Sequence, residues 1–250
     1  MAIKLGSTDI NSVNLGSVGL NRIYSGSDFV FGSGFDFRNG LQFDGINDRV
    51  AIEDGELIFS RASGLSYSFW VYFPEETTAF PTITSSNGSN IGLLFFATDY
   101  IGFYPNGYNT RCFFDYGYNG NRSKKIHIAL TVTSSGDVTC RVDSVLVVKT
   151  TSNTCPTSVR MAGIGKFNTS LTNGAFKIDE FAIYEGKTLT QQEVNTLYNS
   201  GNGNNATSVG VPTFYWKFNE SGATTIVPSA VIGGRNGVLE NFTGDYWVPF

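Results

Sequence analysis

From residue 35 onward, apolar and polar side chains alternate along the chain with a period of two. The alternation is clearest in residues 65–73, 126–132 and 138–142. Successive side chains of a strand point to opposite faces of a sheet, so this pattern predicts half-buried antiparallel strands. Turn sequences such as Asn87-Gly88 separate the runs, because Gly and Asn tolerate the positive φ that hairpins need. The pattern therefore predicts an all-β fold.

One short segment carries the pattern of a helix instead. Thr190 and Glu193 form a capping-box sequence, in which a hydroxyl and a carboxylate satisfy free backbone N–H groups. Val194, Leu197 and Tyr198 follow at helical spacing, and the Asn-Ser-Gly sequence after them predicts the end of the helix.

The first thirty residues repeat with a period of ten. Gly-Ser pairs recur at positions 6–7, 16–17 and 26–27, so each unit predicts a short strand, a turn and another short strand. Three such units are too small for a core of their own, which favours pairing with other copies or with a larger assembly. A meander lying on the main domain is the alternative. The apolar positions expected to serve anchoring and oligomerisation are Leu5, Ile10, Val13, Leu15, Leu20 and Ile23.

The chain divides at the Gly-Ser-Gly sequence of residues 32–34, where the repeats give way to longer apolar runs. We expect an anchor segment at 1–31 and one β-sandwich at 35–250. A length of 250 residues suits one sandwich with a small appendage. With 41% hydrophobic and 15% charged residues, the chain can bury a sizeable core.

The net charge limits the kinds of binding partner, and the cysteine spacing limits the kinds of metal site. A net charge of -4 opposes binding to nucleic acid or to an anionic membrane, both of which need a basic surface. No run reaches the roughly 20 apolar residues of a membrane span, and residues 1–6 lack the apolar region of a signal peptide, so we expect synthesis in a cytoplasm. Cys112, Cys140 and Cys155 have no metal-site spacing and are expected to be buried free thiols.

Several segments resemble one family. Four of these segments are similar to motifs of laminin G-like domains. They are the sequence Leu-Gln-Phe-Asp-Gly at 41–45, the Trp-containing strand 65–72, the Arg-Val-Asp-Ser of 141–144, and the block 174–198 with its Ile-Asp-Glu-Phe-Ala-Ile-Tyr. Ile-His-Ile-Ala-Leu at 126–130 stands where that family has Trp-His-His-Val-Ala. The resemblance implies an antiparallel two-sheet jelly-roll sandwich of the concanavalin A-like lectin class.

The order of the motifs departs from that family. Residues 214–222 and 233–239 resemble the segment that usually precedes the Phe-Asp-Gly motif, yet here they come last. This order indicates a circularly permuted sandwich in which residues 211–250 supply strands that normally open the fold. An incomplete second repeat is the alternative, but about 40 residues could not close a second sandwich.

The sequence gives little support for nucleophilic or acid–base catalysis. His127 lies on an alternating strand, where a packed or hydrogen-bonded histidine is expected. Glucanases of this fold use a Glu-x-Asp-x-x-Glu strand to pair a nucleophile with a general acid, and the sequence has no such strand. Asp179 and Glu180 with Glu185 are the nearest group, and they belong to the resembled closing strand. No catalytic residue is expected.

A calcium site is a weaker hypothesis. Asp44, Asn47, Asp48 and Asp179 could surround one ion if the first turn and the closing strand are neighbours, as the resemblance implies, because Ca²⁺ prefers several oxygen ligands. The alternative is that the turn residues are ordinary turn formers. No cofactor is otherwise required.

Glycan recognition usually combines exposed aromatic rings with amides and carboxylates on loops. Residues 99–119 are rich in aromatic, amide and carboxylate side chains. The alternative is that these tyrosines pack inside the sandwich, as tyrosines near turns often do. The candidate glycan-binding residues are Asp99, Tyr100, Tyr104, Asn106, Tyr108, Asn109, Tyr116, Tyr118 and Asn119.

The repeat followed by a lectin-like domain resembles appendage proteins of tailed bacteriophages. That resemblance implies a non-enzymatic virion fibre or decoration protein, anchored to other virion proteins through residues 1–31. We expect it to form a homo-oligomer such as a trimer and to contact host-surface polysaccharide. The alternatives are a purely structural decoration or cement protein, a cellular carbohydrate-binding adhesin, and a glycan-cleaving enzyme.

Overall fold

The computed structural model describes residues 39–250 except 78, 87–91, 152 and 166–173, and gives the backbone of six short strands within residues 3–32. The chain divides into two compact units, Met1–Asp36 and Phe37–Phe250.

The first unit contains three hairpins, one for each repeat. In each, two antiparallel strands pair on either side of a Gly-Ser position, which confirms the two predicted strands of each repeat. The side chains expected to serve anchoring lie outside the described part of the structure, so their role stays a prediction. They are Leu5, Ile10, Val13, Leu15, Leu20 and Ile23. The six strands are β1 (Ile3–Leu5), β2 (Thr8–Ile10), β3 (Val13–Leu15), β4 (Val18–Leu20), β5 (Arg22–Ser25) and β6 (Asp28–Gly32).

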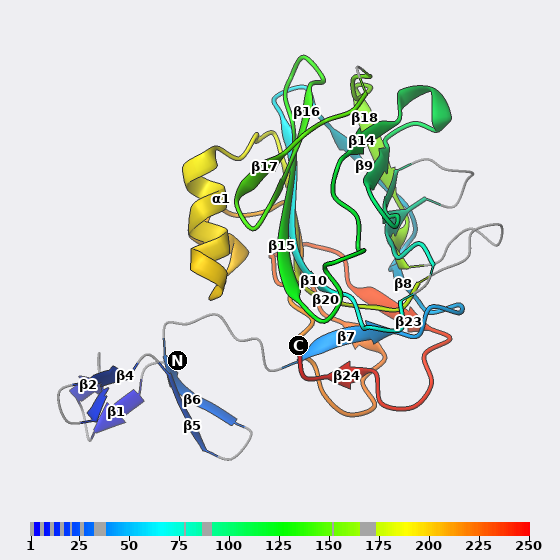
Figure 1. The fold of residues 1–250 in the computed structure, drawn as a ribbon. Helices are drawn as coiled ribbons and strands as arrows, with labels where there is room; N and C mark the ends of the chain where they lie inside the picture. The colour runs from blue at the N-terminus through cyan, green and yellow to red at the C-terminus, as the bar shows by residue number, and fades with distance from the viewer. Residues whose placement is uncertain are drawn as a thin grey trace. The chain divides into compact units, whose positions relative to one another are not determined.

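The second unit is a sandwich of two antiparallel sheets, which confirms the predicted fold class (Figure 1). The first sheet has the order β17-β16-β15-β10-β20-β7-β24, and β21 also pairs with β20. Its strands are β7 (Gly40–Phe43), β10 (Leu65–Tyr72), β15 (Lys125–Val132), β16 (Val138–Val142), β17 (Val145–Val147), β20 (Phe176–Glu185), β21 (Phe214–Trp216) and β24 (Trp247–Val248).

The second sheet has the order β14-β13-β12-β11-β19-β8-β23-β22. Its strands are β8 (Arg49–Ile52), β11 (Thr82–Ser85), β12 (Leu93–Phe96), β13 (Ile101–Tyr104), β14 (Cys112–Phe114), β19 (Gly163–Gly165), β22 (Ile226–Val227) and β23 (Gly237–Glu240). A separate two-stranded sheet joins β9 (Leu57–Ser60) to β18 (Ser158–Met161). Three 3₁₀ turns complete the described elements: η1 (Tyr108–Thr110), η2 (Asn199–Gly201) and η3 (Ala206–Val209).

The main core fills the space between the two sheets. Alternate residues of β10, including Tyr67 and Phe69, point inward and are buried with Leu94 and Phe103 of the second sheet. The rings of Tyr67 and Phe103 pack edge to face with centroids 6.0 Å apart, a favoured aromatic geometry. All three cysteines are buried free thiols, as predicted.

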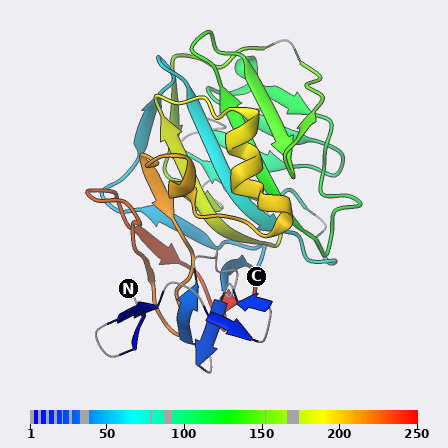
Figure 2. The same ribbon diagram turned by 90° about the vertical axis from the view of Figure 1, so that its left-hand side faces the viewer.

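A helix covers the outer face of the first sheet (Figure 2). This helix, α1 (Gln191–Tyr198), begins at the predicted capping box of Thr190 and Glu193, with both reciprocal hydrogen bonds present. Its buried residues Val194 and Leu197 pack on Ala129 and other outward residues of the sheet. Among the described residues, no helix is long and apolar enough to cross a membrane.

Residues 211–250 contribute to both sheets. Strand β21 pairs with β20 and β24 with β7 in the first sheet, while β23 pairs with β8 in the second. Trp216 of β21 is fully buried, and its indole Nε1 donates to the carbonyl of Arg235 at 2.9 Å. These residues are thus part of the sandwich, as the resemblance implies, and their permuted order stays a prediction.

Replacing Trp216 tests how much the sandwich depends on this segment. We expect Trp216→Ala to lower the free energy of unfolding by about 3–5 kcal/mol, because it leaves a cavity and an unpaired carbonyl. Ile232→Ala, a fully exposed change in the same segment, should shift it by less than about 0.5 kcal/mol. Urea unfolding measures both. A Trp216→Ala effect as small as that of the control would contradict an integral role for residues 211–250.

Candidate functional site

Aromatic side chains gather on the outer face of the second sheet, away from the main core. Strands β12, β13 and β14 turn one set of residues inward, among them Phe96 and Phe103, and the alternate set outward. We call the outward set the aromatic face and define it by Phe80, Phe95, Tyr100, Tyr104 and Phe113.

The rings of the aromatic face contact one another. Phe95 lies at the centre, with its ring centroid 5.3 Å from that of Tyr104, 6.0 Å from that of Tyr100 and 6.1 Å from that of Phe80. Tyr100 and Phe113 approach to 4.8 Å. Most of these pairs are edge to face, the geometry that aromatic quadrupoles favour, so the rings support one another as a fixed surface.

Gly102 makes room for the central ring. It pairs directly with Phe95 across β13 and β12, and a Cβ atom at Gly102 would lie 2.3 Å from carbons of the Phe95 ring. The ring therefore covers the backbone of its neighbour strand, which only glycine permits without displacement.

Polar groups surround the exposed part of this surface. Phe80 is 39% exposed and Tyr100 and Phe113 are half-buried, whereas Phe95 and Tyr104 are buried, so the accessible rings are Phe80, Tyr100 and Phe113. The guanidinium of Arg111, itself exposed, lies 5.5 Å from the centroid of the Phe113 ring, a cation–π distance. Asp99 is also exposed beside Tyr100. Apolar rings bordered by charged groups suit a ligand with both C–H surface and hydroxyls.

The structure brings together only some of the candidate glycan-binding residues. Tyr100 and Tyr104 belong to the aromatic face, and the loop residues Asp99, Asn106, Asn109 and Asn119 are exposed. The side chain of Tyr108 lies outside the described part of the structure.

Two of the tyrosines point the other way. Tyr118 is 3% exposed and packs in the main core against Phe73. Tyr116 also packs against the main core, and its hydroxyl donates to Oδ1 of Asn121 at 2.8 Å. These rings stabilise the sandwich and do not form part of the aromatic face.

Sequence reasoning missed Phe80, Phe95, Arg111 and Phe113. In β12 the sequence Leu-Leu-Phe-Phe is apolar on both faces, so it carries no alternation that would show which rings point outward. The glycine opposite Phe95 was the available signal, because a glycine inside a strand often marks a place where another group lies close to the backbone.

The expected calcium ligands separate into two places. Asp44 and Asp48 share one turn, in which Asp48 Oδ2 accepts from the Asp44 N–H at 2.8 Å and Asp44 Oδ1 accepts from the Ile46 N–H at 2.7 Å. The carbonyl of Asn47 accepts from Nδ2 of Asn241 at 3.1 Å. The two carboxylates thus hold the turn itself together.

Asp179 is not part of that turn. Strands β7 and β20 are neighbours, but Phe43 pairs with Phe176 and Leu41 with Ile178, so Asp179 lies near Gly40. Four residues of strand, roughly 13 Å, separate that position from Asp44. In the described part of the chain, no group of three His, Cys, Asp or Glu side chains could hold a metal ion. The four predicted ligands do not form one site, and calcium binding by the turn alone stays a prediction.

A family model described as the concanavalin A-like lectin/glucanases superfamily matches residues 43–195. The chain belongs to this superfamily. No curated protein matches the sequence.

Several solved structures are similar to this lectin/glucanase chain, and one of them, with a TM-score above 0.5, shows the same fold. A candidate carbohydrate-binding protein from Bacteroides ovatus is 14% identical, with a TM-score of 0.53, over 81% of this chain and 61% of that one. The binding domain of botulinum neurotoxin DC, solved with rat synaptotagmin II, is 17% identical with a TM-score of 0.39, over 61% of this chain and 42% of that one. A type C botulinum neurotoxin structure, from work on its dependence on two ganglioside molecules for cell entry, is 16% identical with a TM-score of 0.40, over 65% and 51%. The chain thus spans less than two thirds of each of these proteins.

The superfamily includes glucanases, so the carboxylates of this lectin/glucanase chain must be considered as candidate catalytic groups. Asp179 and Glu180 are buried, and Glu180 accepts a hydrogen bond from the Tyr215 hydroxyl. Glu185 accepts from the backbone N–H of Ser60. His127 is buried beside Ser68, and burial lowers its pKa to about 3, so it is neutral at pH 7. Retaining or inverting hydrolysis needs two carboxylates on either side of an accessible glycosidic bond. Asp179 and Glu180 are instead buried in the packed sheet, and Glu185 is exposed at the end of β20.

Asp48 predicts a pH dependence of stability. Burial raises its pKa to about 6, the hydrogen bond from the Asp44 backbone N–H opposes this, and the Asp44 charge adds to it. The folded protein then binds the proton more tightly than the unfolded chain, so Asp48 contributes stability at low pH that is lost as pH rises from about 4 to about 6. We expect Asp48→Asn to be more stable than the wild type at pH 7 by about 1–3 kcal/mol, with the difference vanishing near pH 4.

Thermal unfolding of both proteins across this pH range measures the difference. Burial raises the pKa of Glu220 to about 7. This residue is present in both proteins, so its contribution to the pH dependence cancels in the difference. Parallel pH profiles would contradict a desolvated Asp48. Calcium at the turn would favour the charged carboxylate, so calcium should raise the midpoint of the wild type and not that of Asp48→Asn if the turn binds it.

Proposed function

We propose that this chain is a non-enzymatic glycan-binding protein and that the aromatic face is its binding surface. The observation that carries the proposal is the group of five mutually packed rings on the outer face of the second sheet, bordered by Arg111 and Asp99. The burial of Asp179 and Glu180, with Glu180 accepting a hydrogen bond from Tyr215, supports binding without hydrolysis.

A sugar fits this surface better than an apolar ligand does. One face of a pyranose presents C–H groups that pack on aromatic rings, while its edge presents hydroxyls to charged and amide groups. Asn106 and Asn109 are exposed near Tyr104 and can supply amides. Patches of this kind on a soluble protein usually mark an interaction site.

We further propose that the protein is a virion fibre or decoration protein of a tailed phage that meets host-surface polysaccharide. The three hairpins of residues 3–32 support this, because each is too small to fold alone and suits docking onto other virion proteins or other copies of the chain. A homo-oligomer such as a trimer would raise weak single-site affinity through multivalency. A purely structural decoration protein and a cellular adhesin are the competing functions.

Substitutions in the aromatic face test glycan binding. We expect Tyr100→Ala and Phe113→Ala each to weaken binding to the recognised polysaccharide about tenfold, since about 1.4 kcal/mol of ring contact is lost. The measurement is binding of the full chain to a panel of bacterial surface polysaccharides. Val211→Ala, an exposed apolar change elsewhere, should leave binding unchanged. Absence of binding to every polysaccharide, even with multivalent display, would favour the structural role.

The virion role has its own test. Mass spectrometry of purified phage particles should detect the chain, and deletion of residues 1–31 should remove it from particles while leaving it soluble in the lysate. Retention of the deleted form in particles would contradict anchoring through the repeats. Detection only on the surface of uninfected cells would support the adhesin.

A further inference from the structure

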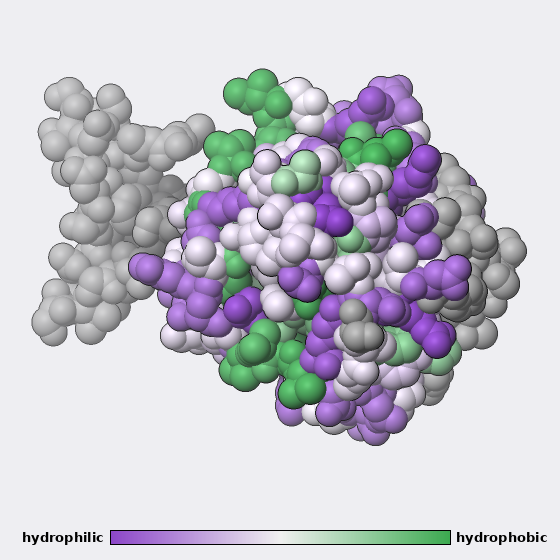
Figure 3. All heavy atoms as spheres, turned by 90° about the horizontal axis from the view of Figure 1, so that it is seen from above, coloured by the Kyte–Doolittle hydropathy of each residue, from purple (hydrophilic) through white to green (hydrophobic). Residues whose placement is uncertain are grey.

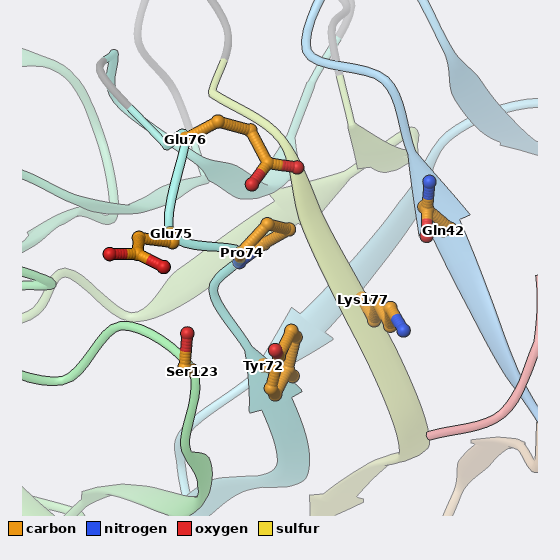
Figure 4. A pocket seen from close by; sticks show the side chains of 7 residues that line it. All are labelled: Gln42, Tyr72, Pro74, Glu75, Glu76, Ser123 and Lys177. Carbon is orange, nitrogen blue, oxygen red and sulfur yellow. The ribbon is translucent and has the colours of Figure 1, made fainter.

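A pocket of about 310 Å³ lies on the first sheet, away from the aromatic face (Figure 4). Its floor is a row of outward side chains on three neighbouring strands, since Tyr72 of β10 pairs with Lys177 of β20 and Lys177 pairs with Gln42 of β7. The segment after β10, with Glu75 and Glu76, closes one side. The volume is at the low end for ligand pockets, about 300–1,000 Å³, and suits a single sugar unit.

The pocket combines apolar rings with polar groups. The rings of Tyr72 and Pro74 line it, and each is at least partly buried. Within the described residues, the side chains of Gln42 and Ser123 and the Tyr72 hydroxyl make no hydrogen bond. These groups can therefore donate to and accept from a ligand that carries hydroxyls.

Charge decides the kind of ligand. Lys177 Nζ donates one hydrogen bond to the carbonyl of Pro249 at 3.0 Å, lies 5.0 Å from the centroid of the Tyr72 ring, and is attracted by the charge of Glu76. Glu75 and Glu76 are exposed and, in the part of the chain that the structure describes, make no ion pair within salt-bridge distance. The lining carries two carboxylates and one ammonium, which sum to one negative charge.

We propose that this pocket binds an amino sugar unit whose amine is free and protonated. The ammonium of the sugar pairs with Glu75 or Glu76, its hydroxyls meet Gln42 and Ser123, and its C–H face packs on Tyr72. An acidic sugar would face the two carboxylates and is excluded by repulsion. The aromatic face, which carries Arg111 instead, suits a different part of a polysaccharide.

Titration of the full chain with D-glucosamine, followed by NMR chemical shifts of the Tyr72 and Ser123 backbone amides, tests the proposal. We expect saturable binding that is about tenfold or more weaker in the double variant Glu75→Gln, Glu76→Gln, because charge-assisted hydrogen bonds are lost. Both side chains are exposed, so the variant should fold normally. D-glucose and N-acetyl-D-glucosamine should bind about tenfold or more weakly than glucosamine.

Control proteins separate this site from others. Asp54→Asn, Asp245→Asn removes two exposed charges elsewhere and should bind glucosamine like the wild type. Val211→Ala, an exposed change outside both surfaces, should also bind it unchanged. No saturable glucosamine binding, equal binding of glucose, equal binding of ethylamine, or unchanged binding by the Glu75→Gln, Glu76→Gln variant would each overturn the proposal.

Discussion

Burial of the central strands on both of their faces is the constraint on which the rest of this structure depends. Strand β10 is buried at seven of its eight positions. Its inward residues pack against the second sheet, and the outward face of the first sheet requires a second cover, which α1 and η3 supply through Val194, Leu197 and Ala206. The ring of Trp70 packs against those of His127 and Tyr198, with centroids 5.2 and 5.9 Å away. The first sheet is thus closed over most of its outer face.

Because α1 and η3 cover the first sheet, the outer faces of the two sheets differ in what they leave accessible. The helix occupies the middle of the first sheet, so the pocket over Tyr72 lies toward one end of it, where β10 gives way to a loop. The second sheet has no α-helix on it among the described elements, and its outward aromatic rings contact one another there. The other surfaces are mixed, and the end-on view in Figure 3 shows apolar residues in separate patches among polar ones. The two surfaces proposed for recognition therefore differ in chemistry.

Sequence reasoning predicted what depends on local pattern and missed what depends on register. The sandwich, the capping box of α1 and the three hairpins follow from periodicity and turn residues, and all were confirmed. Asp179 was misplaced because β7 and β20 are neighbours, but only their register shows that it lies beside Gly40. The pocket joins residues from positions 42, 72 and 177, which no short motif connects. Tyr100 and Tyr118 both lie near turns, and only the folded chain shows that one faces outward and the other faces the core.

The contribution of residues 211–250 to both sheets also bears on how the protein is made. Arg49 pairs with Glu240 across 191 positions of sequence, and contacts of such separation form late and slowly. A nascent chain leaving the ribosome must keep its Phe- and Tyr-rich strands without their last partners until residue 240 has emerged. The sandwich therefore folds after synthesis of this region, and a message cut short before it yields chains with exposed strand edges that are prone to aggregation and proteolysis.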